Sequence, residues 1–284
     1  MPLQILQEPA VEPLTLQEAK LHLRVDVIDD DALISALITS VRQYAETITR
    51  RAFIQQVWSY VIDSFPGPTL IGVPWGKTFT LPAHAIEIEK SRVQQVLAIN
   101  YLDMSGNPQV MPAAEYVVDY SSEPCRITPV FGQIWPIPLP QIGACNVQFV
   151  AGYAAPVAFD PSAGTVAVQG AWKPYAVGDA VQFSNVSGLL PVGLSPGTSY
   201  FIASVVAPGV YTLAATPGGP AISLTDAGSG VSLIGVVPEG IKSWMKVRMT
   251  SLYEYRGDVV IPERGKVEPL AYVDRLLDPY KVMF

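Results

Sequence analysis

The most regular alternation of apolar and polar residues lies between Leu14 and Val57, and it predicts two helices followed by a strand. Thr15 and Glu18 have the spacing of a capping box, in which each side chain bonds a backbone N–H at the helix start. The acidic residues 29–31 are predicted to lie at the N-terminus of the second helix and to cap it, because negative charge is favourable there. Its apolar residues recur at helical spacing and share one face; they are Ile34, Leu37, Ile38, Val41, Tyr44, Ala45 and Ile48.

Short β-favouring segments bounded by turn residues follow the helices and predict strands. These segments cover residues 56–63, 79–81, 85–88, 96–102, 116–119, 126–128 and 146–150. A polar turn from Asp103 to Pro108 suits a hairpin. The alternating prolines of residues 135–140 predict an extended arm, because proline fixes φ and donates no hydrogen bond.

Residues 155–235 differ in composition from the rest of the chain. They hold 12 of the 22 glycines but only four charged side chains. Further strands are predicted at residues 165–168, 180–183, 199–206, 210–214 and 221–224, with Gly- and Pro-containing turns between them. Regular short strands of this kind predict a small all-β sandwich or barrel.

A third helix is predicted after this segment, with Pro238 at its first position and Gly257 beyond its end. The apolar residues of the C-terminal tail predict a short helix that ends before Pro279. The predicted fold class is therefore α+β, with a helical bundle packed on antiparallel strands. In this organisation, residues 1–154 and 236–284 form a discontinuous core, and residues 155–235 form an inserted all-β domain.

Composition narrows the class of protein. Only 15% of the residues are charged, which is low for a soluble monomer and has two explanations. Partner subunits cover much of the surface, or the protein is β-rich with uncharged polar faces. No signal peptide or membrane span is predicted, and the two cysteines, Cys125 and Cys145, are expected to stay reduced and buried. The net charge of −7 argues against a general nucleic-acid binder.

No arrangement of residues predicts catalysis, a metal site or a cofactor site. His22 and His84, the two histidines, lie in no recognisable motif, and no nucleophile has a base at a known spacing. The acidic residues 29–31 lack the spacing of a calcium loop. An alternative function is carbohydrate or receptor binding by residues 155–235, in which Trp172 and Tyr175 are expected to be exposed and to stack on sugars.

The segment LTLQEAKLHLRVD with the following DDDALISALITSVRQYAETITRRAFIQQVW resembles the N-terminal signature of tailed-phage head–tail connector (adaptor) proteins of the gp6/gp15-like group. YLDMSG, FVAGY and LYEYR resemble later landmarks of that family, and residues 155–235 resemble a β-module of phage structural proteins. The resemblance implies a non-enzymatic virion protein at the head–tail interface, assembled in the host cytoplasm. It also implies a dodecameric ring beneath the portal, with a tail or stopper protein on the other side. Double-stranded DNA is expected to pass through the lumen without specific binding.

The expected contacts with the portal or with neighbouring subunits involve the C-terminal tail and the third helix. An apolar stripe in a chain terminus suggests docking on a neighbour, with packing on the chain's own core as the alternative. The predicted interface residues are Leu270, Val273, Leu276, Leu277, Tyr280, Phe284, Ile241, Trp244 and Arg248.

Overall fold

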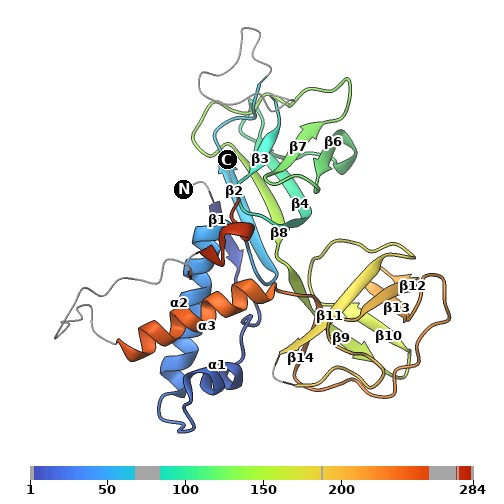
Figure 1. The fold of residues 1–284 in the computed structure, drawn as a ribbon. Helices are drawn as coiled ribbons and strands as arrows, with labels where there is room; N and C mark the ends of the chain where they lie inside the picture. Colours follow the sequence, from blue (N-terminus) through green and yellow to red (C-terminus); the bar gives the residue numbers. More distant parts are fainter. Residues whose placement is uncertain (1–2, 68–83, 187, 256–272, 274, 283–284) are drawn as a thin grey trace. The chain divides into compact units, whose positions relative to one another are not determined.

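The computed structural model describes residues 3–67, 84–186, 188–255, 273 and 275–282. The chain has three described α-helices and several antiparallel sheets, which confirms the α+β class (Figure 1). The described residues divide into two compact units. The first unit comprises residues 3–8 and 56–152, and the second comprises residues 9–55 and 153–282.

The first unit is built from two antiparallel sheets. The larger has the strand order β1-β2-β8-β4-β5, and the smaller has the order β3-β7-β6 (Figure 1). The strands are β1 Leu3–Gln7, β2 Gln56–Ile62, β3 Ile86–Ile88, β4 Val93–Leu102, β5 Pro108–Val110, β6 Tyr116–Asp119, β7 Cys125–Pro129 and β8 Cys145–Ala151. Every predicted strand in the described part of this unit is present, and β4 and β5 form the predicted hairpin. The predicted strand at residues 79–81 lies outside the described residues, and β1 was not predicted.

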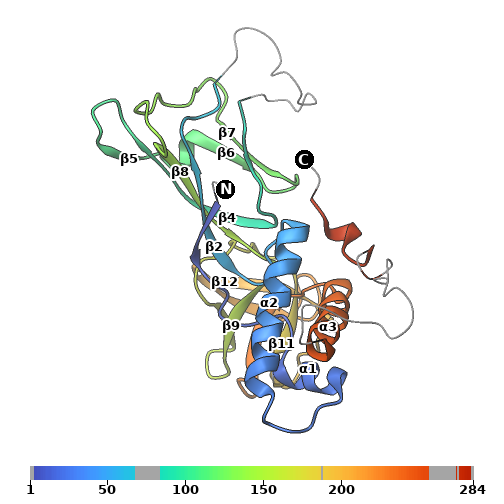
Figure 2. The ribbon, with the colours of Figure 1, turned by 90° about the vertical axis from the view of Figure 1, so that its left-hand side faces the viewer.

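The helices of the second unit share one hydrophobic core. They are α1 Leu16–Leu23, α2 Asp31–Thr49 and α3 Glu239–Glu254, and α2 and α3 lie side by side (Figure 2). Both bonds of the predicted capping box are present: Thr15 N donates to Glu18 Oε2 at 2.9 Å, and Glu18 N donates to Thr15 Oγ1 at 2.8 Å. The face predicted for α2 contributes Ile34, Ile38, Val41 and Ala45 to the core.

The expected cap at the start of α2 is wrong in detail. Asp30 is the N-cap residue, but its side chain makes no cap hydrogen bond. Its Oδ2 instead accepts a 2.5 Å hydrogen bond from the Tyr253 hydroxyl of α3. The Asp30 carboxylate therefore makes a tertiary contact with α3 and does not cap the N-terminus of α2 as predicted.

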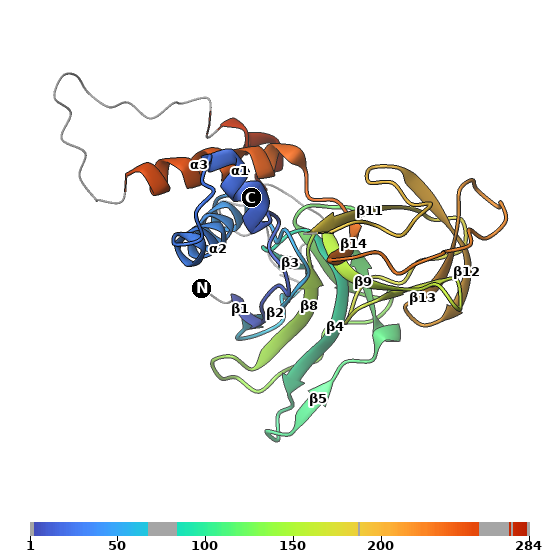
Figure 3. The same ribbon diagram turned by 90° about the horizontal axis from the view of Figure 1, so that it is seen from below.

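A closed barrel of six strands follows in the order β10-β13-β12-β11-β14-β9 (Figure 3). Its strands are β9 Ala154–Asp160, β10 Thr165–Val168, β11 Ala180–Val186, β12 Ser199–Ala207, β13 Val210–Ala214 and β14 Val231–Gly235. The predicted strand at residues 221–224 is wrong, because only Ala221 pairs, in an isolated bridge with Ala214. β9 and β14 were not predicted, yet they pair with each other and with β10 and β11 to close the barrel.

The barrel is not separate from the helical core, because Ala154 and Leu233 belong to the same cluster of buried side chains as α2 and α3. The Gln55 backbone N–H also donates to the Ala154 carbonyl at 2.8 Å. An independently folding inserted domain, and a helical bundle packed on the strands, stay predictions.

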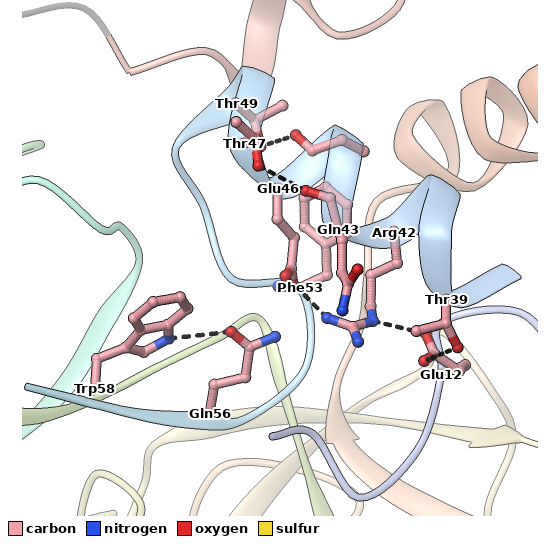
Figure 4. A network of polar contacts seen from close by, with 11 residues as sticks. Glu12, Thr39, Arg42, Gln43, Glu46, Thr47, Thr49, Phe53, Gln56 and Trp58 are labelled. Carbon is pink, nitrogen blue, oxygen red and sulfur yellow. Dashed lines mark hydrogen bonds and ion pairs between the residues drawn. The ribbon is translucent and has the colours of Figure 1, made fainter. Parts of the chain in front are cut away.

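A buried ion network holds the second unit together around α2 (Figure 4). Arg42, 3% exposed, donates from Nε to Glu12 Oε2 at 2.7 Å and from Nη1 to Glu46 Oε2 at 3.0 Å. The other oxygen of Glu46 accepts the Phe53 backbone N–H at 2.9 Å. The Arg42–Glu46 pair therefore joins three chain segments: the segment before α1 through Glu12, α2 itself, and the loop after α2 through Phe53.

Replacing Arg42 with Met is expected to lower the free energy of unfolding by about 3–5 kcal/mol, because Glu46 would stay buried without its cation. Urea unfolding followed by circular dichroism measures the change. The matched control is Lys20→Met, which removes the more exposed Lys20–Asp31 pair and should cost at most about 1 kcal/mol. Equal losses in the two variants would show that burial of the network does not matter to stability.

Candidate interaction surfaces

The structure places most of the predicted interface residues in the chain's own core. Ile241, Trp244 and Leu277 are fully buried, and Val273 is 7% exposed. Leu276 and Tyr280 pack against the same cluster. Leu270 and Phe284 lie outside the described residues.

The described part of the C-terminal tail is held against α2 and α3. Arg51 Nε donates to the Tyr280 carbonyl at 2.5 Å, and Val282 N donates to the Thr49 carbonyl at 3.2 Å. A Cβ on Gly240 would lie 2.9 Å from the Tyr280 hydroxyl, so the absence of a side chain there lets the ring approach α3. The apolar stripe of the tail is therefore covered by its own subunit in this structure, and its contact with a portal stays a prediction.

Arg248, a predicted interface residue, is partly exposed and lies beside an exposed aromatic side chain. Its guanidinium carbon lies 5.8 Å from the centre of the Tyr44 ring, and that ring lies 6.0 Å from the ring of buried Trp244. Leu252 follows Arg248 at i+4 on α3, and Tyr255 is the C-cap residue just beyond the end of this helix. Tyr44, Leu252 and Tyr255 are 49%, 42% and 57% exposed. We call Tyr44, Arg248, Leu252 and Tyr255 the α2–α3 face.

This face has the composition of an interaction site. Tyrosine and arginine are enriched among the residues that dominate binding energy at protein interfaces. Arg248 has no carboxylate partner among the described residues. The Tyr44 ring contacts both the Trp244 ring and the Arg248 guanidinium, so little conformational entropy would be lost when a partner covers it.

A second exposed apolar surface lies in the first unit, on residues 131–142, which we call the proline arm. Four bulky apolar side chains are almost fully exposed there; they are Phe131 at 106%, Ile134 at 75%, Ile137 at 74% and Ile142 at 91%. No residue from 127 to 143 is charged. Isolated exposed apolar residues are normal, but a group of four on one uncharged segment marks a site of protein interaction.

The proline arm is fixed in place although it has no regular secondary structure. Trp135 is buried and stacks on Phe65, with ring centroids 4.9 Å apart and ring planes 6° apart. Its Nε1–H donates to the His84 carbonyl at 2.7 Å, and Leu139 N donates to the Leu102 carbonyl at 2.8 Å. The residues before Pro136, Pro138 and Pro140 are restricted to extended conformations. The predicted extended arm thus presents its apolar side chains on a preformed backbone.

The exposed aromatic residues required by the carbohydrate-binding alternative are not exposed. Trp172 and Tyr175 are 7% and 9% exposed, and Trp172 Nε1 donates to the Tyr175 hydroxyl at 3.2 Å. The Tyr175 ring packs edge-on against Tyr211 of the barrel. Both rings therefore serve the barrel core and present no platform on which a sugar could stack.

The described residues contain no group of three or more His, Cys, Asp or Glu side chains that could hold a metal ion. None of the described helices is long and apolar enough to cross a membrane. Both cysteines are free and buried, as predicted. Burial raises the pKa of the Cys125 thiol to about 12 and that of the Cys145 thiol to about 11.

Residues 13–100 match the family model of the phage gp6-like head-tail connector protein, which confirms the resemblance in the sequence. None of the curated proteins matches the chain. The fold is similar to that of a chain from the neck of an empty GTA particle computed with C6 symmetry, with a TM-score of 0.54 and 14% identity, covering 100% of this chain and 97% of that chain. A chain from the virion of a native gene transfer agent (GTA) particle gives a TM-score of 0.53 at 13% identity, with the same coverage. A chain from the neck of a native GTA particle computed with C12 symmetry gives 0.50 at 14% identity, covering 99% and 96%.

Thiol labelling is expected to be at least about 100-fold slower in the folded protein at pH 8 than in 6 M guanidinium chloride. The thiolate is the reactive form, and raised pKa values together with burial keep both cysteines protonated and covered. Absorbance after addition of Ellman's reagent measures the rate. Fast release of one equivalent from the folded protein would show that one of the two sites opens.

Proposed function

We propose that this chain, whose residues 13–100 carry a gp6-like head–tail connector domain, is a structural protein of a phage-like virion that joins the head to the tail. The family match is the observation that carries the proposal. The likeness in fold to chains of GTA necks and virions supports it, because that likeness extends over the whole chain. The protein would act through shape and contact, without a catalytic step.

We further propose that the chain forms a closed ring of twelve subunits beneath the portal, with a tail or stopper protein on the other side of the ring. Neck assemblies that contain chains of similar fold have been computed with C6 and C12 symmetry, and both symmetries are compatible with twelve copies. Each subunit of a closed cyclic ring must offer two different patches that fit each other. The chain carries two separate exposed apolar surfaces, the α2–α3 face and the proline arm, which meets that requirement. The ring would assemble in the host cytoplasm before it becomes part of the virion.

Passage of DNA through the lumen agrees with the charge of the chain. A net charge of −7 per subunit gives a ring that repels the phosphate backbone more than it attracts it. The two charged side chains within α2 that follow its first residue, Arg42 and Glu46, are paired with each other and buried. They are therefore not available to hold a duplex by counterion release.

Mass photometry tests the ring directly. We expect the purified chain, alone or mixed with the portal ring of its own virus, to form a particle of twelve 30.6 kDa subunits, about 370 kDa in addition to the portal. Binding to the portal as single subunits without closure would contradict the ring. Absence of binding to the portal in either form would contradict the connector function itself.

Binding to DNA is expected to be weak. Filter binding of duplex DNA at about 0.15 M salt should give no affinity tighter than the non-specific micromolar range. The measurement should be repeated at lower salt, where even a non-specific contact becomes visible. Nanomolar, salt-sensitive affinity would instead indicate a protein that binds DNA tightly through its phosphates.

A further inference from the structure

The two exposed apolar surfaces of the chain are chemically matched. We infer that the proline arm of one copy docks on the α2–α3 face of the next copy in the ring. This inference rests on the proposed ring and goes beyond it, because it names the two surfaces that make the contact between subunits.

The proline arm limits what can bind it. Pro136, Pro138 and Pro140 have no N–H, so the arm cannot be recruited as a strand of a partner's sheet along this stretch. The proline-rich segment instead offers apolar side chains, proline rings and backbone carbonyls, of which the Leu139 carbonyl already accepts from Gln141 N at 2.8 Å. A suitable partner must supply aromatic or aliphatic side chains and hydrogen-bond donors. Acidic side chains would find no cation, because residues 127–143 carry no charge.

The α2–α3 face supplies those groups. Tyr44 and Tyr255 are half-exposed rings, and grooves lined by aromatic side chains are the usual receptors of extended proline-rich segments. Leu252, four residues after Arg248 on α3, adds aliphatic surface, and Tyr255 is the C-cap residue of that helix. Arg248, which has no carboxylate partner among the described residues, can donate to backbone carbonyls of the arm.

A second copy of the chain is the occupant that the observations favour. A cyclic ring needs two unlike patches on every subunit, and here the two patches lie on different compact units of one chain. Both are preformed: Trp135 and Leu139 anchor the arm, and Trp244 anchors Tyr44. Preformed surfaces lose little conformational entropy when they bind. A small contact area repeated between all neighbouring subunits is therefore sufficient to stabilise the ring.

A charge placed on each surface in turn tests the contact. Ile137→Glu puts a negative charge on the arm, and Leu252→Arg puts a positive charge on the face. Both positions are exposed, so neither change should prevent folding. Each variant alone is expected to weaken ring formation. Leu252→Arg should do so at least about tenfold, because a second cation would be buried beside Arg248 without a carboxylate, and Ile137→Glu by a smaller factor, because Arg248 offsets only part of the cost of burying the new carboxylate. Circular dichroism of each variant checks the fold. Val177→Glu and Ala207→Arg, on exposed positions of the barrel unit, are the matched controls and should assemble like the wild type.

An equimolar mixture of Ile137→Glu and Leu252→Arg chains is the decisive sample. In a ring where the two variants alternate, every Glu-bearing arm meets an Arg-bearing face, and every wild-type arm meets a wild-type face. Such a ring needs an even number of subunits, which twelve satisfies. We therefore expect mass photometry to show that the mixture forms the ring more readily than either variant alone.

The outcomes separate this inference from the proposed function. If the wild type forms a ring and both variants do so equally well, the inference is overturned and the connector function stands. If the variants fail and the mixture also fails, the arm and the face do not meet, and another virion protein becomes the occupant of the arm. A wild-type chain that remains monomeric both alone and on its portal overturns the ring and the inference together.

Discussion

The second unit depends on one buried cation. Arg42 and Glu46 are buried and Glu12 is 27% exposed, and the removal of charges from water is costly unless each is paired. Glu12 and Glu46 meet this need, and Glu46 also accepts the backbone N–H of Phe53. The position of α2 is thereby linked to the chain segment before α1 and to the loop that enters β2. Phe53 and Ile54, both fully buried, then continue the core from the helices to the first strand of the barrel.

Because Arg42 and Glu46 are buried, the exposed surface of α2 carries little charge. Between Asp31 and Arg50, Arg42 and Glu46 are the charged residues of α2, and both side chains are buried. The exposed side of this helix consists of small or uncharged residues, which are Ala32, Ser35, Ala36, Ser40, Gln43, Tyr44 and Thr47. A low overall content of charge has two explanations in the sequence, and the structure contains elements of each. The barrel is rich in uncharged polar turns, while the α2–α3 face and the proline arm are apolar surfaces suited to partners.

Features that depend on residues close together in the sequence, such as helix caps and strands, were predicted well. The capping box links residues three positions apart, and both of its bonds are present. Most strands were predicted because their alternation is visible within a few residues. The Arg42–Glu12 pair joins residues 30 positions apart, so it could not be predicted from a periodic pattern in the sequence. β9 and β14 were missed for a related reason, since Pro156 and the glycines before Val231 look like turns until the barrel closes around them.

The candidate site was predicted less well than the fold, because exposure is a property of tertiary structure. Periodicity identified an apolar stripe in the tail, but periodicity cannot say whether that stripe meets a neighbour or its own core. Leu277 is buried in its own core, and Trp172, which turn residues suggested was exposed, is buried in the barrel unit. The alternating prolines predict an extended backbone for the arm, and the structure shows residues 133–139 without helix or strand. The exposure of Phe131 and Ile142 depends on how Trp135 is anchored, which the sequence does not reveal.

The edges of the larger sheet explain why assembly would use side chains rather than strand pairing. An edge strand with free backbone groups invites uncontrolled pairing with other chains, and natural sheets blunt such edges. Here β5 is only three residues long and begins with Pro108, while β1 has a register shift between Ile5 and Gln7. The proline arm is protected in the same way, because three of its residues have no N–H. Contacts made by side chains on a fixed backbone favour one partner in one orientation, and a ring that must close after a set number of copies depends on that selectivity.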